Sequence, residues 1–363
     1  MSQARRMLSV GSVGVGSVGV GLVGVGSVGI ALIGTGRMGW IFARALAELR
    51  GDCKLVLVVN RSENSAREMG EHFACAYGTD LEVALNDPAV DAVVIATTTP
   101  SHTEIAIACA KAGKPFFIEK PIADNLENGR LIVRAVEQAG VQTMVGFQRR
   151  FDPAYAQAKA QIDAGVLGRL EVFRSVSRDP EMGSSSLEFH LGSGGLIVDL
   201  GVHDMDLARW LVGEVLEVQA LGGALSDPSL AAHGLHDTAV ALLRFENGAF
   251  GTVEMARRTV YGHEVRTEVL GEYGKLNIER DQRGDLRTYS KTGGNFDRAR
   301  GFEERFAQAY NLEMAAFVHG LRAGQPLMPN VRDGWYSLRL AFAAQHALET
   351  GTTVQVNQFA PIP

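Results

Sequence analysis

The chain has 363 residues, 46% of them hydrophobic and 21% charged, and a formal net charge of −6 at pH 7. This is the composition of a globular protein, and the length indicates two domains. A negative chain without clustered Lys and Arg is not expected to bind nucleic acid. Outside the N-terminal extension, no apolar run is long enough to span a bilayer.

The N-terminal extension is a low-complexity segment. Residues 1–27 consist largely of a five-residue Val-Gly repeat that runs from Val10 to Gly29. Ordering so much glycine is entropically costly, so we expect disorder, with a self-associating arm as the alternative. Arg5-Arg6 precedes this stretch, but alternating Val and Gly is unlike the core of a secretory signal. The chain has three cysteines, Cys53, Cys75 and Cys109, an odd number whose spacing predicts no metal site. The cysteines and the lack of a secretory signal pattern together favour a cytoplasmic protein.

The first forty residues contain the pattern G-x-G-x-x-G four times, and three copies are by-products of the repeat. The fourth copy, Gly34/Gly36/Gly39, follows the apolar run Ile30–Ile33 and precedes an amphipathic sequence from Trp40. A dinucleotide fingerprint needs this strand and helix, because the pyrophosphate lies on the helix N-terminus. This copy predicts an NAD(P) site.

Strands and helices alternate after the fingerprint. Predicted strands cover 54–59, 91–96 and 115–119, with helices over 62–73, 80–85 and 102–112. Such alternation predicts an α/β Rossmann domain with a doubly wound parallel sheet, which we place at residues 28–148.

Residues 149–363 follow a different pattern. Strand 237–245 joins 249–255 through Asn247-Gly248, and 265–270 joins 275–279 in a second predicted hairpin. With late helices at 304–322 and 333–349, this predicts an α+β domain with a large, mostly antiparallel, open-faced sheet for substrate binding and oligomerisation.

Several polar residues follow the predicted parallel strands, where ligands bind in such sheets. Asn60 stands where a carboxylate usually bonds the adenosine ribose, and Arg61 is suited to a 2′-phosphate, so we expect NAD or NADP with a lean to NADP. The expected cofactor-binding residues are Gly34, Thr35, Gly36, Arg37, Met38, Asn60, Arg61, Thr97, Thr98, Thr99, His102, Glu119 and Lys120. By itself His102 reads as a capping or packing residue. In Glu119-Lys120-Pro121, proline can set the turn through a cis bond and aim the lysine inward.

Asp199 and His203 are four residues apart in an amphipathic segment, hence on one face of a predicted helix. Histidine titrates near neutral pH, and a neighbouring carboxylate can orient it as a general base. The same spacing also fits a purely structural hydrogen bond.

Four spaced motifs together resemble the Gfo/Idh/MocA oxidoreductase family, with inositol 2-dehydrogenases the nearest subgroup. They are Gly34-Thr-Gly36-Arg-Met-Gly39, Glu119-Lys120-Pro121, Gly146-Phe147-Gln148-Arg149-Arg150-Phe151-Asp152-Pro153 and Asp199-Leu-Gly-Val-His203-Asp204-Met-Asp206. The resemblance covers most of the chain from Ile30 onward and implies a homodimer or homotetramer.

In the scheme that this resemblance implies, Lys120, Asp199 and His203 are catalytic. His203 takes the proton of a substrate hydroxyl, Asp199 orients His203, and Lys120 stabilises the developing charge on oxygen. The implied contacts to a small-molecule polyol are Lys120, Gln148, Arg149, Asp179, Asp199, His203, Tyr261 and His263.

The expected reaction is oxidation of a secondary hydroxyl of a cyclic polyol, myo- or scyllo-inositol, to the ketone. The loop between Asp179 and Asp199 looks longer than in myo-inositol dehydrogenases, which leaves the substrate open. A sugar or dihydrodiol dehydrogenase of the same family is the alternative enzyme, and a non-catalytic NAD(P) sensor is the alternative outside enzymes. Retention of Lys120, Asp199 and His203 together favours the enzyme.

Overall fold

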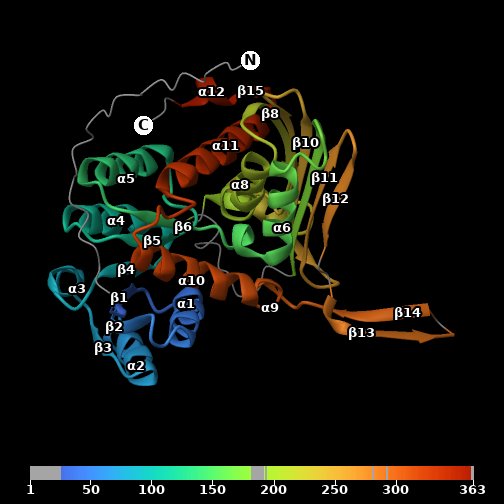
Figure 1. Cartoon of the computed structure of the whole chain (residues 1–363). Helices are drawn as coiled ribbons and strands as arrows, with labels where there is room; N and C mark the ends of the chain where they lie inside the picture. The colour runs from blue at the N-terminus through green and yellow to red at the C-terminus, as the bar shows by residue number, and fades with distance from the viewer. Residues whose placement is uncertain (1–25, 181–191, 193, 280–281, 292, 361–363) are drawn as a thin grey trace, which may run out of the picture.

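A computed structural model describes residues 26–180, 192, 194–279, 282–291 and 293–360. Two of the four glycine patterns, and the loop from 181 to 191, therefore lie outside the described residues, and the third, Gly24/Gly26/Gly29, lies partly outside them. Most strands of the described residues belong to two large sheets (Figure 1).

The first sheet has six parallel strands in the order β3-β2-β1-β4-β5-β6, which confirms the predicted doubly wound sheet. Every residue of β1, β4, β5 and β6 is buried, as expected for strands with helices on both faces. The strands are β1 (Val28–Ile33), β2 (Cys53–Val59), β3 (Ala76–Gly78), β4 (Ala92–Ile95), β5 (Phe116–Glu119) and β6 (Thr143–Gly146).

The helices of this half are α1 (Arg37–Glu48), α2 (Glu63–Phe73), α3 (Leu81–Asn86), α4 (His102–Lys111) and α5 (Leu126–Ala139). Local sequence fixes their ends. The side chain of Ser62 caps α2 and that of Asn125 caps α5, while Gly140 ends α5 with a φ of 66°.

The second sheet has seven strands in the order β12-β11-β7-β10-β9-β8-β15. Only β7 and β10 pair in parallel among its described strands, so the expected mostly antiparallel sheet is confirmed, as are both predicted hairpins. Its strands are β7 (Leu170–Pro180), β8 (Val215–Gly223), β9 (Thr238–Phe245), β10 (Phe250–Thr259), β11 (Glu264–Gly271), β12 (Gly274–Glu279) and β15 (Val354–Gln355).

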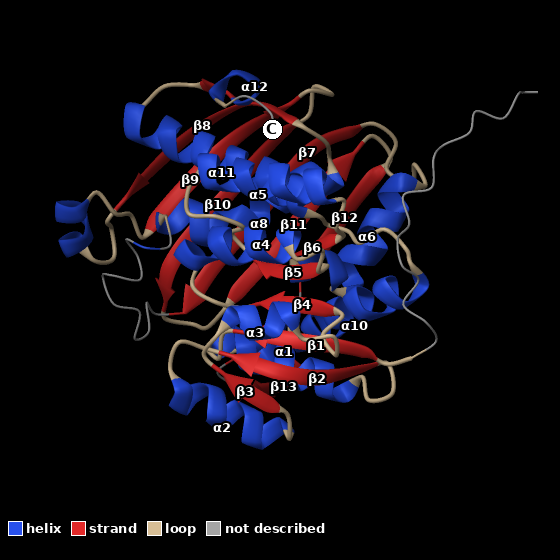
Figure 2. Cartoon of the chain, turned by 90° about the vertical axis from the view of Figure 1, so that its left-hand side faces the viewer, coloured by secondary structure: helices blue, strands red, loops and turns tan. Residues whose placement is uncertain are grey.

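Helices lie between the two sheets. Figure 2 shows the second sheet behind this helical layer, in which α11 contacts α5 and β6 on one side and α8 and β8 on the other. The helices of this half are α6 (Pro153–Asp163), α8 (Val202–Leu211), α9 (Phe302–Arg305), α10 (Ala307–Ala323), α11 (Val331–Thr350) and α12 (Val356–Phe359). The predicted late helices are present, except that Phe306 separates α9 from α10.

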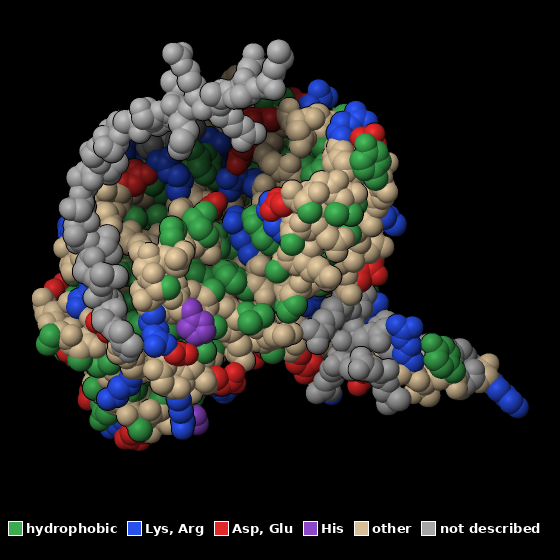
Figure 3. Space-filling model, in the orientation of Figure 1, with side chains coloured by type: hydrophobic (Ala, Val, Ile, Leu, Met, Phe, Trp, Pro, Cys, Tyr) green, Lys and Arg blue, Asp and Glu red, His purple; other side chains and the backbone are tan. Residues whose placement is uncertain are grey.

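One feature of the second half was not predicted. Strands β13 (Gln282–Ser290) and β14 (Gly293–Arg298) form a hairpin, labelled in Figure 1, that projects from the rounded body in Figure 3. Tyr289 of β13 is 74% exposed. As expected for an open-faced sheet, the outer face of the second sheet carries exposed apolar side chains, among them Leu221, Leu242 and Phe250. No helix among the described residues is long and apolar enough to cross a membrane.

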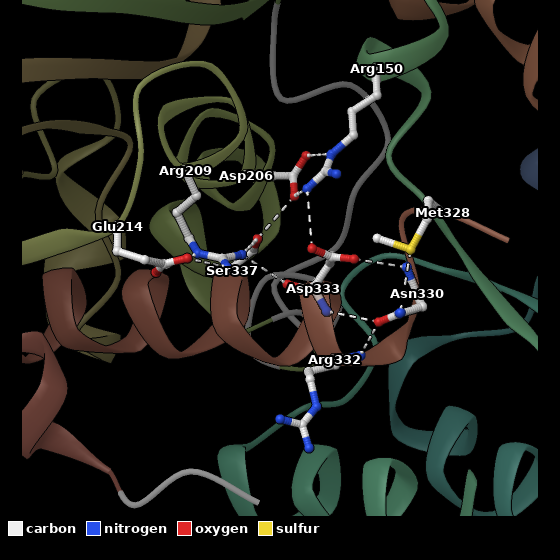
Figure 4. A network of polar contacts seen from close by, with 9 residues as sticks. All are labelled: Arg150, Asp206, Arg209, Glu214, Met328, Asn330, Arg332, Asp333 and Ser337. Carbon is white, nitrogen blue, oxygen red and sulfur yellow. Dashed lines mark hydrogen bonds and ion pairs between the residues drawn. The ribbon is translucent and has the colours of Figure 1, made fainter. Parts of the chain in front are cut away.

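Buried ion pairs hold α8 in place (Figure 4). The short helix η2 (Gln148–Phe151) carries Arg150, whose guanidinium makes two hydrogen bonds of 2.7 and 2.8 Å to Asp206 of α8. Ser337 of α11 donates a further bond of 3.0 Å to Asp206. Arg209, one turn further along α8, bonds Ser337 and Glu214. The network therefore ties the end of the first sheet to α8 and α11.

We predict that Asp206→Asn destabilises the protein by about 3 kcal/mol, because the enclosed Arg150 guanidinium loses its two hydrogen bonds to a carboxylate and keeps only the more distant Asp333 at 3.8 Å. Denaturant unfolding measures the loss. Glu171→Gln is the control, since the Arg169–Glu171 pair is exposed and is expected to contribute less than about 1 kcal/mol. Equal losses in the two variants would contradict this account of the network.

Candidate active site

Four parallel strands end side by side at one edge of the first sheet. Ile33 of β1 pairs with Ile95 of β4, Ile95 with Ile118 of β5, and Glu119 with Gly146 of β6. The strand order reverses between β1 and β4, the place where α/β sheets open a crevice for ligands. The residues that follow these strands therefore face one region.

The three fingerprint glycines each have a distinct steric environment. Gly34 has a φ of 104°, and a Cβ on it would lie 2.5 Å from the Ala96 carbonyl oxygen. A Cβ on Gly39 would lie 2.2 Å from the Gly34 carbonyl oxygen, so only glycine lets α1 pack this closely on the end of β1. A Cβ on Gly36 would meet no atom within 4 Å. The backbone at Gly36 and the start of α1 thus fit a pyrophosphate.

The end of β2 presents no carboxylate. Asn60 is half-buried and donates weakly, at 3.4 Å, to the Ser62 carbonyl oxygen, and Arg61 is exposed. The Ser62 hydroxyl accepts the Ser65 amide at the start of α2.

After β4, His102 links two loops. Its Nδ1 lies 2.9 Å from the Pro121 carbonyl oxygen and its Nε2 lies 3.2 Å from that of Thr97. Burial lowers the pKa of His102 to about 4, so the imidazole is neutral near pH 7. It therefore joins the loop after β4 to the turn after β5. The hydroxyl of Thr97 is buried without a partner among the described residues, whereas Thr98 is exposed.

Glu119 is the last residue of β5, directly before Lys120, and its side chain is buried. Glu119 accepts the Lys120 amide at 2.9 Å, and burial raises the pKa of its carboxyl to about 7. Glu313 of α10 is fully buried nearby, and burial together with Glu119 raises its pKa well above the usual range. The Lys120–Pro121 bond is cis, as the sequence allowed.

Lys120 reaches across to the second half of the chain. Its Nζ donates to the backbone oxygen of Asp199 at 2.8 Å and to Oδ1 of the same residue at 3.3 Å. Both side chains are about four-fifths enclosed, with 18% and 19% exposure. This ion pair joins the carboxyl edge of the first sheet to the helical layer over the second.

Asp199 does not lie in an α-helix with His203. It belongs to the π-helical turn η3 (Ile197–Gly201), whereas His203 is in α8. The wider π-turn changes the angle between the two side chains, and such turns are frequent at functional sites. The described residues include no hydrogen-bond partner for Nδ1 of His203, so Asp199 does not bond this nitrogen.

His203 is 7% exposed and contacts the ring of Phe147 edge-on, with centroids 6.2 Å apart. Burial lowers its pKa well below the ordinary value, and the positive charges of Lys120 and Arg149 lower it further. The imidazole is therefore neutral near pH 7 and keeps the lone pair that a general base needs.

Arg257 of β10 was not predicted from the sequence. It is 6% exposed, and its Nη2 donates to Oδ2 of Asp199. Asp199 thus bridges two cations, Lys120 and Arg257. The sequence signal was the position of Arg257, which continues the every-second-residue series of Val253 and Met255 and so falls on their face of the strand.

Asp179 and His263 form a carboxylate–imidazole pair at the end of the second sheet that carries Arg257. Nε2 of His263 is 3.5 Å from Oδ1 of Asp179, and burial lowers the pKa of His263 to about 3. Partial burial raises the pKa of Asp179, against the opposing charges of Arg257 and Lys120. Asp179 is the register partner of Arg257, whose guanidinium bonds Asp199, so the Asp179–His263 pair neighbours the Lys120–Asp199 pair.

The remaining substrate residues expected from the sequence differ in their surroundings. Gln148 and Arg149 are buried in η2, and Arg149 bonds Asp204 at 2.8 Å and Ser177 at 3.0 Å. Tyr261 lies apart, with its hydroxyl between Arg178 and Glu264. Arg178 precedes Asp179 in β7 and so points to the opposite face of the sheet.

The site therefore combines a nucleotide-binding sheet edge with a buried lysine, a carboxylate and a neutral histidine. In the described part of the chain, no group of three or more His, Cys, Asp or Glu side chains is placed to hold a metal ion. Residues 28–147 match the oxidoreductase family GFO_IDH_MocA, described as an NAD-binding Rossmann fold, and residues 159–356 match its C-terminal alpha/beta domain. The chain belongs to the Gfo/Idh/MocA family of oxidoreductases.

Relatives within the Gfo/Idh/MocA family include inositol dehydrogenases. The chain is 36% identical to a scyllo-inositol 2-dehydrogenase (NAD(+)) of Bacillus subtilis, over 89% of this chain and 94% of that protein. It is 35% identical to a myo-inositol 2-dehydrogenase of Thermotoga maritima, over 89% and 97%. The crystal structure of scyllo-inositol dehydrogenase from Lactobacillus casei with bound NAD(H) and scyllo-inositol aligns with a TM-score of 0.86 at 30% identity, covering 91% of this chain and 99% of that one.

We predict that two alanine substitutions in the fingerprint have different effects, one on NAD binding and the other on stability. Gly36→Ala should leave the free energy of unfolding within about 0.5 kcal/mol of wild type but weaken NAD binding about tenfold, since its Cβ enters open space meant for the pyrophosphate. Gly39→Ala should lower stability, because its Cβ overlaps the Gly34 carbonyl oxygen. Calorimetric NAD titration and denaturant unfolding measure both effects. Unchanged NAD affinity in Gly36→Ala would exclude this placement of the cofactor.

Proposed function

We propose that the protein is an NAD(P)-dependent dehydrogenase that oxidises a secondary hydroxyl of a cyclic polyol, with myo- or scyllo-inositol as the substrate. The observation that carries the proposal is the Lys120–Asp199 pair at the carboxyl edge of the NAD-binding sheet, beside neutral His203. The inositol dehydrogenases among the relatives support the substrate class.

The proposed roles follow from the charges. His203 accepts the proton of the reacting hydroxyl, because its imidazole is neutral near pH 7. Lys120 donates a hydrogen bond to the same oxygen and stabilises the negative charge that develops there. Asp199 holds Lys120 and accepts a hydrogen bond from a neighbouring hydroxyl. The bound nicotinamide cofactor supplies the hydride acceptor.

Further polyol contacts are proposed for Gln148, Arg149, Asp179 and His263. Asp179 and His263 stand beside the catalytic pair and offer an acceptor and an imidazole to hydroxyls elsewhere on the ring. Arg149 contributes positive charge to the same region, since it lowers the pKa of both His203 and His263.

We propose that the cofactor site accepts NADP as well as NAD, with a preference for NADP. Asn60 brings no negative charge to the end of β2, and exposed Arg61 is available for a 2′-phosphate. The Gly34–Gly39 turn and the start of α1 would hold the pyrophosphate. Thr97, Thr98, Thr99, His102 and Glu119 would line the nicotinamide end.

A homodimer or homotetramer is proposed from the outer face of the second sheet, where Leu221, Leu242 and Phe250 are exposed. The three free cysteines support a reducing, cytoplasmic location.

The test is a matched titration of NAD and NADP against myo-, scyllo- and chiro-inositol, glucose and xylose. We expect turnover of an inositol, at least as good with NADP as with NAD, and loss of most activity in Lys120→Ala. Strong turnover of the sugars with none of the inositols would contradict the substrate assignment. Full polyol-dependent cofactor reduction by Lys120→Ala would contradict the mechanism.

A further inference from the structure

Strand β10 contains an irregularity next to the site. Its pairing with β7 shifts between Arg257 and Thr259, so Arg258 is an extra residue without a partner on β7. Arg258 has a φ of 86°, in a region that residues other than glycine rarely adopt. Bulges next to active sites redirect side chains, and strained residues persist where the surrounding structure requires them.

Regular alternation along β10 up to the irregularity places Arg257 on the inner side of the sheet, and Thr259 beyond it lies on the same side. Both are buried, with 6% and 8% exposure, while Arg258 between them is exposed. Arg257 then pairs in register with Asp179 of β7, and its guanidinium reaches Asp199 of η3. It therefore lies between two carboxylates that come from different parts of the chain.

These two carboxylates repel each other. The charge of Asp199 raises the pKa of Asp179, whereas Arg257, Lys120 and Arg149 lower it, and His263 faces Asp179 as a neutral imidazole. Arg149 is already bonded to Asp204, and Lys120 is needed at the substrate oxygen. Arg257 supplies the second positive charge that two enclosed carboxylates require in order to stay ionised together.

We propose that Arg257 is a positioning residue of the polyol site: it holds Asp199 against Lys120 and keeps Asp199 and Asp179 jointly ionised as acceptors for two substrate hydroxyls. The inference rests on the proposed polyol dehydrogenase activity.

The test compares Arg257→Gln, Arg257→Lys and the control Arg258→Gly in the full chain. Arg257→Gln should lower kcat/KM for inositol at least about tenfold, as expected for loss of one charge-assisted hydrogen bond, with KM for the cofactor unchanged. The acidic limb of its kcat/KM profile should move to higher pH. Arg257→Lys should restore the limb but only part of kcat/KM, because it keeps the charge and loses the planar fork. Arg258→Gly should match wild type.

A second measurement does not depend on turnover. In protein labelled at the aspartate carboxyl carbons, 13C NMR should show two carboxyl groups that titrate at higher pH in Arg257→Gln than in wild type or Arg258→Gly. An unchanged titration, or a wild-type pH profile and kcat/KM in folded Arg257→Gln, overturns the inference. Absence of polyol turnover in the wild type would instead refute the proposed function, and the carboxyl titration would still decide whether Arg257 keeps both aspartates ionised.

Discussion

The ion pair between Lys120 and Asp199 is the contact on which the site depends. Lys120 directly follows β5 of the first sheet, and Asp199 lies within η3 over the second, 79 residues later in the chain. Each half alone carries an incomplete set: a nucleotide-binding edge with a lysine, or a carboxylate with a histidine. The pair brings them together, and the Arg150–Asp206 network nearby fixes the same junction through buried charges.

Burial determines the protonation of the groups around this pair. Desolvation keeps His102, His203 and His263 neutral, and it raises the pKa of Glu119 and Glu313 beneath Lys120. The groups that remain charged are paired with groups of opposite sign, and Asp199 forms ion pairs with both Lys120 and Arg257. A polyol entering such a site meets hydrogen-bond acceptors and donors that are already oriented, which lowers the reorganisation needed for proton transfer.

The sequence was sufficient to predict several strands of each large sheet, because their patterns are local. The apolar run Ile30–Ile33 and the Asn247-Gly248 turn each specify an element without help from distant residues. Lys120, Asp199 and His203 were found through family motifs. The π-turn at Asp199 was not, because spacing alone assumes an α-helix. Arg257 was missed because it lies beyond the predicted strand 249–255 and looks solvated until the distant Asp199 is known.

The central claim is that Lys120 and Asp199 act as one unit in catalysis, and a double-mutant cycle measures this most directly. Lys120→Met, Asp199→Asn and the double variant are compared by kcat/KM for inositol. The account predicts that the double variant is hardly slower than the slower single variant, with a coupling free energy of at least about 1 kcal/mol. Losses that simply multiply would show that the two residues act independently and would contradict it.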